Sequence, residues 1–145
     1  MKPRVEIIAL GGTIACQPGP AGKGVAPGLT AADLVVAVPE LSDRAEVGAR
    51  NLANVPSTEI DLPLLFALAD AIRTHEEEGV AGIVITQGTD TIEETAFVLD
   101  LLYQGALPVV VTGAMRNPSL PGADGPANLL AAVTCAADLA CRDLG

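Results

Sequence analysis

Two hydrophobic patterns alternate along this chain: short runs of consecutive apolar residues, and longer stretches in which apolar residues recur every three or four positions. The first pattern and its flanking turns predict strands over 5–10, 82–86 and 108–112, and a further strand is predicted over 44–52. The second pattern, with Thr, Asp and Pro at the starts, predicts helices over 30–39, 61–79, 91–105 and 124–144. Strands that alternate with helices indicate an α/β fold of three layers. We therefore expect a mostly parallel sheet with helices on both faces, of the flavodoxin-like kind.

The sequence also predicts where two of these helices begin and which of their residues face the core. Asp61 and Pro63 are typical of a helix start, and the core face of that helix should carry Leu65, Leu68, Ala69 and Ile72. Its outer face should carry Asp70, Arg73, Glu76 and Glu77. The segment Thr91–Glu94 fits a capping box, and that helix should turn four residues to the core, namely Ala96, Leu99, Leu102 and Tyr103.

Residues 17–28 contain four glycines and three prolines and are predicted to form no packed element. Two interpretations remain open for this segment. It is either a mobile surface loop that covers a site as a lid, or a plain connector.

Composition and charge narrow the function. The net charge is −10 and only eight of the 145 residues are Lys or Arg. Without clustered cations, neither nucleic acid nor an anionic membrane surface is an expected partner. No apolar run is long enough to span a membrane, and the N-terminus lacks the features of a signal peptide, so a cytoplasmic location is expected. Three cysteines without paired spacing (Cys16, Cys135 and Cys141) are predicted to be buried thiols, with no metal site.

Four polar segments follow the predicted strands: Gly11–Thr13, Ser57–Thr58, Gln87–Asp90 and Gly113–Arg116. The carboxyl ends of parallel strands meet at one edge of the sheet, and ligands of such folds bind there. The sequence thus predicts a binding site built from four loops.

These loops carry groups suited to acyl transfer from an amide. Gly12 and Gly88 let the backbone turn and expose N–H groups that can hold an oxyanion. Thr13 and Thr89 supply hydroxyls, and Asp90 adds a carboxylate. A phosphate site is the main rival interpretation, but neither glycine-rich phosphate signature is present and Asp90 would repel a phosphate. Taken singly, each motif is also compatible with an ordinary turn.

The ordered set of motifs closely resembles the bacterial L-asparaginase family, in particular its N-terminal, nucleophile-bearing domain. The resemblance rests on four segments, GGTIA at 11–15, ITQGTDTIEETA at 85–96, GAMR at 113–116 and ADGPANL at 123–129. It implies hydrolysis of L-asparagine to L-aspartate and ammonia through an acyl-enzyme, with no cofactor. L-Glutamine is a second candidate substrate, and a homo-oligomer is implied because a neighbouring subunit completes the family's active site.

The resemblance also implies roles for individual residues. Thr13 would be the attacking nucleophile, and Thr89 would position or activate water. Asp90 would bind the substrate's α-amino group and Ser57 its α-carboxylate. Thr58 would be a further polar contact with the substrate.

Three departures from the family pattern leave alternatives open. Gln87 stands where the family commonly has His, residues 17–30 contain no Tyr, and the only lysines are Lys2 and Lys23. Residues 1–145 are expected to form the asparaginase-type N-terminal domain, with the family's C-terminal domain and its lysine absent from this chain. One alternative is a catalytically silent amino-acid-binding module. Another is the asparaginase-like subunit of a tRNA amidotransferase.

Overall fold

A central sheet of four parallel strands organises the fold in the computed structural model, which describes residues 1–18 and 25–144. The strands lie in the order β4-β1-β5-β6, with bounds Glu46–Asn51, Arg4–Ala9, Gly82–Thr86 and Val109–Thr112. Numbered along the chain, this order is 2-1-3-4, as in flavodoxin-like sheets. The predicted fold class is confirmed, and each predicted strand is present with small shifts at its ends.

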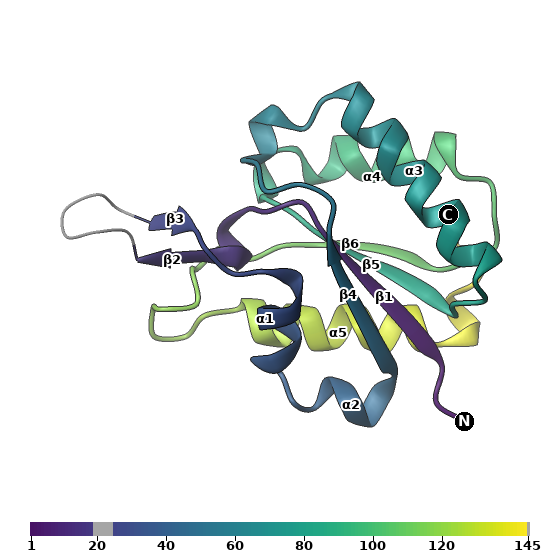
Figure 1. The fold of residues 1–145 in the computed structure, drawn as a ribbon, viewed down its shortest axis with the longest axis horizontal. Helices are drawn as coiled ribbons and strands as arrows, with labels where there is room; N and C mark the ends of the chain where they lie inside the picture. The colour runs from purple at the N-terminus through teal and green to yellow at the C-terminus, as the bar shows by residue number, and fades with distance from the viewer. Residues whose placement is uncertain (19–24, 145) are drawn as a thin grey trace.

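Helices cover both faces of this sheet (Figure 1). One face packs against α1 (Ala31–Val36), α2 (Leu41–Arg44) and α5 (Gly125–Ala137). The other packs against α3 (Leu62–Glu77) and α4 (Ile92–Leu102). Because side chains alternate along a strand, neighbouring residues of β1 serve different cores: Ile7 packs with the first group and Ile8 with the second. The fold therefore has two apolar cores separated by one sheet.

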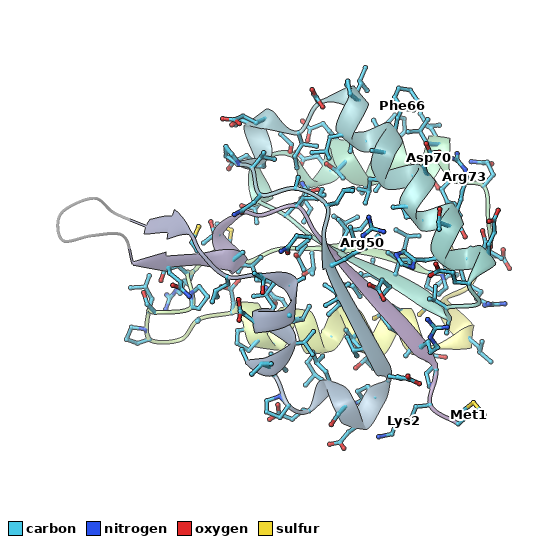
Figure 2. The ribbon with its side chains drawn as sticks, in the orientation of Figure 1. Met1, Lys2, Arg50, Phe66, Asp70 and Arg73 are labelled. Carbon is cyan, nitrogen blue, oxygen red and sulfur yellow. The ribbon has the colours of Figure 1, made fainter. Side chains whose placement is uncertain are left out.

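The start and the core face of the longest helix, α3, form as the sequence predicts, whereas Glu76, predicted on the outer face, is half-buried. The Asp61 carboxylate accepts a hydrogen bond from the Leu64 N–H over 2.9 Å, and Pro63 occupies the first turn. The four predicted core residues of α3 are all buried. Asp70 and Arg73 form an ion pair of 2.7 Å on the outer side of the helix (Figure 2). The amphipathic pattern thus sets both the position and the rotation of this helix.

The glycine- and proline-rich segment differs from its prediction at both ends. Cys16–Pro18 forms β2 and Val25–Pro27 forms β3, and the two pair as an antiparallel ribbon apart from the main sheet. Proline is tolerated at the ends of such edge strands because it forfeits few ladder hydrogen bonds there. The predicted lid falls largely on residues 19–24, which lie outside the described residues.

The start of α4 also departs from its prediction. A 3-10 turn, η3 (Thr89–Thr91), precedes the helix, and Thr91 makes no capping hydrogen bond with its side chain. Its hydroxyl instead donates to the Ser57 carbonyl over 3.1 Å. The capping-box prediction was therefore wrong, because a tertiary acceptor takes the hydroxyl that a local cap would use.

The predicted core face of α4 is partly corrected. Leu99 and Tyr103 are buried and Leu102 packs against the core, but Ala96 is exposed and Thr95 is buried in its place. Tyr103 follows the helix, and its hydroxyl accepts a hydrogen bond from the Leu107 N–H over 3.2 Å. Burial raises the pKa of Tyr103 to about 12.

The final helix is shorter than predicted. It ends at Ala137, and a 3-10 turn, η4 (Leu139–Cys141), follows, whose first turn is capped by the Asp138 carboxylate. Cys135 is exposed, and Cys16 and Cys141 are half-buried, so the prediction of three buried thiols was wrong. Across residues 1–18 and 25–144, no helix combines the length and apolarity needed to cross a membrane.

Candidate functional site

The four polar loops meet at the carboxyl edge of the sheet, where backbone hydrogen bonds join their bases. The Leu10 N–H donates to the Thr86 carbonyl over 2.9 Å, and the Val55 N–H donates to the Leu10 carbonyl over 2.9 Å. The Gln87 N–H donates to the Thr112 carbonyl over 3.0 Å. The base of each loop is thus fixed to a neighbouring strand end, just before the candidate site residues.

Gly12 brings the first and third loops into direct backbone contact. It has a φ of +84°, in the region that favours glycine, and a Cβ placed on it would overlap the backbone nitrogen of Gly88. Thr13 follows Gly12 at the start of the 3-10 turn η1 (Thr13–Ala15). The buried Ile14 and Ala15 hold this turn against the core. The close contact between Gly12 and Gly88 therefore brings the loops of Thr13 and Thr89 together.

The Gly12–Gly88 contact predicts a large effect of a single added methyl group. Gly12→Ala should lower the free energy of unfolding by about 2–4 kcal/mol, because the new Cβ combines an unfavourable φ with overpacking. Chemical denaturation measures this change. Gly79→Ala is the matched control, since Gly79 has a φ of +78° but no atom within 4 Å of its added Cβ. Equal losses in the two variants would show that backbone strain alone, and not the loop contact, makes Gly12 necessary.

The second and third loops are tied by hydrogen bonds between side chains and backbone. Ser57 opens the 3-10 turn η2 (Ser57–Glu59) and is only 3% exposed. Its hydroxyl donates to the Asp90 carboxylate over 3.0 Å, and the Thr91 hydroxyl donates to the Ser57 carbonyl. A Cβ on Gly88 would lie 2.8 Å from the Ser57 hydroxyl oxygen. Ser57 and Asp90, predicted to share a site, are thus in direct contact.

The two remaining candidate hydroxyls differ in their surroundings. Thr89 is half-buried, and its methyl group lies 3.1 Å from the position of a Cβ on Gly113, so the fourth loop packs against it. Thr58 is exposed on η2, and none of the hydrogen bonds that join the loops involves it. The structure therefore gathers Thr13, Ser57, Thr89 and Asp90 at one edge, with Thr58 at its margin.

Asp124 and Asn128 hold the fourth loop, and the sequence patterns above gave neither a role. The Asp124 carboxylate accepts hydrogen bonds from the N–H groups of Met115 and Arg116, over 2.9 and 2.8 Å. The Asn128 side chain donates to the Gly113 carbonyl over 3.0 Å and to the Asp124 carboxylate over 3.1 Å. Their spacing of four residues at the start of a predicted helix was the available signal.

The Asp124 hydrogen bonds predict a pH-dependent stability. The N–H groups of Met115 and Arg116 lower the pKa of Asp124 below its ordinary value. A carboxyl group with a lowered folded pKa stabilises the fold above the unfolded pKa of about 3.9, and loses that contribution as the pH falls through the folded pKa. Asp124→Asn should therefore lower Tm near neutral pH, and the deficit should shrink below about pH 4.

Thermal melts from neutral to acid pH, with Asp100→Asn as control, measure this dependence. Asp100 is an exposed carboxylate on α4, so its variant removes the same charge away from the fourth loop. A deficit for Asp124→Asn that stays constant with pH would contradict the assignment.

The site offers hydroxyls, a carboxylate and backbone N–H groups, which suit nucleophilic attack on a carbonyl and stabilisation of the resulting oxyanion. In the described part of the chain no three His, Cys, Asp or Glu side chains are grouped to hold a metal ion. Fold and site together define a class: a doubly wound α/β domain with a hydroxyl and carboxylate site at the carboxyl edge of its sheet.

Comparison with known proteins places this domain in a family. The family model for the N-terminal part of asparaginase matches residues 4–145. The chain is 42% identical to "L-asparaginase 2" of Bacillus subtilis over 138 residues, which are 92% of the chain and 37% of that protein. It is 40% identical to "L-asparaginase 2-3" of Saccharomyces cerevisiae over 141 residues, 93% of the chain and 38% of that protein. The chain belongs to the asparaginase family.

Two further likenesses add to this membership. A crystal structure of a probable cytoplasmic L-asparaginase from Campylobacter jejuni superposes with a TM-score of 0.92 at 36% identity, covering 99% of this chain and 44% of that one. A glutamyl-tRNA(Gln) amidotransferase subunit of Methanococcus vannielii is 37% identical over 135 residues, 92% of the chain and 32% of that protein. The chain thus spans between 32% and 44% of the length of these relatives.

Proposed function

We propose that this chain forms the nucleophile-bearing and substrate-binding part of an amidohydrolase that converts L-asparagine to L-aspartate and ammonia. L-Glutamine is the second candidate substrate. Membership of the asparaginase family supports amide hydrolysis as the type of reaction.

The observation that carries the proposal is the contact of Ser57 with Asp90 beside the Gly12–Gly88 junction. An α-amino acid presents an ammonium and a carboxylate on the same carbon atom. The Asp90 carboxylate accepts a charge-assisted hydrogen bond from the substrate's ammonium, and the Ser57 hydroxyl turns its single proton from Asp90 to the substrate's carboxylate. In the proposed complex the side-chain amide of asparagine lies beside the threonine loops, because Asp90 directly follows Thr89 in the chain. The pair therefore suits an amino acid better than a simple amide.

In the proposed reaction, the Thr13 hydroxyl oxygen attacks the side-chain carbonyl carbon while its proton passes to a general base. The C–N bond then breaks, and the general base gives the proton taken from Thr13 to the leaving nitrogen. Ammonia departs, and an ester to Thr13 remains. Backbone N–H groups of the glycine turns stabilise the negative oxygen that forms during the attack. Water positioned by the Thr89 hydroxyl hydrolyses the ester and releases L-aspartate.

A substrate series tests this proposal through ammonia release by the protein that carries this chain. L-Asparagine should be hydrolysed far better than succinamic acid, which has the same amide but no α-amino group for Asp90 to bind. A preference of about 100-fold in kcat/KM is expected for a charge-assisted contact made in the transition state. Equal rates with the two amides would refute the assigned substrate class.

The likeness to the amidotransferase subunit supports a second candidate function, in which the released ammonia is delivered to a partner's substrate. Ammonia release that depends on a partner protein and on an acylated tRNA would favour this alternative. Release from free L-asparagine by the protein alone favours the hydrolase.

A further inference from the structure

Gln87, the first residue after β5, is a wholly buried polar side chain in the middle of the site, and the proposed reaction gives it no role. Its Nε2 donates to the Gly88 carbonyl over 3.1 Å. Its Oε1 is also buried, with no hydrogen-bond partner among the described residues. A buried acceptor without a partner is destabilising, and an apolar side chain of equal length would fill the same space without that penalty. Stability therefore does not explain Gln87.

The hydrogen bond from Gln87 acts on the peptide group between Gly88 and Thr89. Peptide bonds of the described chain are trans, so the Gly88 carbonyl and the Thr89 N–H point in opposite directions across one plane. With the carbonyl held on the buried side by Gln87, the Thr89 N–H is directed to the other side. Thr89 is the first residue of η3, so this N–H has no acceptor within the turn.

Contacts with neighbouring residues fix the third loop on the N-terminal side of the Gly88–Thr89 peptide, but they do not fix the rotation of that peptide. The Gln87 backbone is fixed by its hydrogen bond to Thr112, and the Gly88 α-carbon is enclosed by Gly12 and Ser57. Gly88 itself has extended φ and ψ angles of −70° and 152°, and as a glycine it resists rotation of the following peptide only weakly. The Gln87 amide supplies the missing constraint.

We propose that Gln87 is a positioning residue, whose side-chain amide sets the orientation of the Gly88–Thr89 peptide and thereby of the Thr89 N–H and hydroxyl. The expected effect of Gln87 on kcat rests on the proposed amide hydrolysis. Its effect on the orientation of the Gly88–Thr89 peptide is independent of that proposal.

Two substitutions separate this role from simple packing. Gln87→Met keeps the length of the side chain but removes both the donor and the unpaired acceptor. It should leave Tm unchanged or raised, lower kcat for L-asparagine about 10- to 100-fold with a smaller change in KM, and change the orientation of the Thr89 N–H vector, which its residual dipolar coupling measures by NMR. Gln87→His retains an N–H donor and should recover most of the lost kcat.

Gln104→Met is the matched control, because Gln104 donates to the Asp100 carbonyl at the exposed end of α4 and lies outside the four loops. It should change neither kcat nor the residual dipolar coupling of the Thr89 N–H. The proposal is overturned if Gln87→Met keeps the wild-type kcat and the wild-type residual dipolar coupling at Thr89, or if kcat falls only in step with stability. Failure of Gln87→His to recover activity also overturns it. If the wild type releases no ammonia, the proposed function fails, and the residual dipolar coupling of the Thr89 N–H alone decides the role of Gln87.

Discussion

Thr13→Ala should lower kcat for L-asparagine hydrolysis by about 1000-fold or more while L-aspartate still binds, because the hydroxyl would form the bond to the substrate's acyl group. Ala keeps the backbone of η1, whose buried anchors are Ile14 and Ala15 rather than the Thr13 side chain. Steady-state ammonia release and calorimetric titration with L-aspartate measure the two quantities on the same preparation.

A matched control for this substitution is Thr134→Ala. The Thr134 hydroxyl donates to the Leu130 carbonyl on the exposed side of α5, so its loss removes a threonine hydroxyl far along the chain from the four loops. Activity of Thr13→Ala within about tenfold of wild type would rule out a threonine acyl-enzyme at this position. Loss of both activity and folding would be detected by the melting curve, and Thr13→Ser would then test the hydroxyl without removing it.

Asp90→Asn should act mainly on binding and raise KM for L-asparagine about 100-fold, because it removes the negative charge that attracts the α-ammonium group. The new side chain has the same shape, and its amide oxygen can still accept the hydrogen bond from Ser57. The effect should therefore come from charge rather than from collapse of the loop. Kinetics over a range of substrate concentrations separate KM from kcat.

Succinamic acid sharpens this test. Since it lacks the α-ammonium group, its kcat/KM should be nearly the same for wild type and Asp90→Asn, whereas the value for L-asparagine should fall. Asp100→Asn again controls for the loss of one negative charge on an acidic protein. An equal fall for both amides would show that Asp90 supports the loop or the chemistry, and not recognition of the amino acid.

The helices show which structural features can be predicted from local sequence alone. The position and rotation of α3 follow from Asp61, Pro63 and the apolar spacing, and all of these signals are local. The start of α4 does not follow in the same way, because the Thr91 hydroxyl bonds to Ser57, which is 34 residues away along the chain. A capping motif competes with tertiary acceptors, and a single sequence does not reveal which of them is near.

The candidate site likewise has features that local sequence predicts and features that depend on tertiary contacts. Its four loops were predictable because each follows a strand, and parallel strands deliver their carboxyl ends to one edge. The sequence patterns did not predict the hydrogen bonds of Asp124 and Asn128 with the fourth loop, although the spacing of the two residues was visible. Their acceptors and donors at 113–116 become neighbours only when α5 packs beside β6.

The amino-acid sequence by itself determined the α/β class, the strands and long helices, and the gathering of the loops that carry Thr13 and Thr89, because periodicity and turn residues act locally. Only the tertiary structure decided three further features. These are the Gly12–Gly88 contact, the pairing of Ser57 with Asp90, and the burial of Gln87 against the Gly88 carbonyl. Each depends on which backbone atoms of distant segments meet within hydrogen-bonding or van der Waals distance, and that distance is set by the packing of the whole sheet.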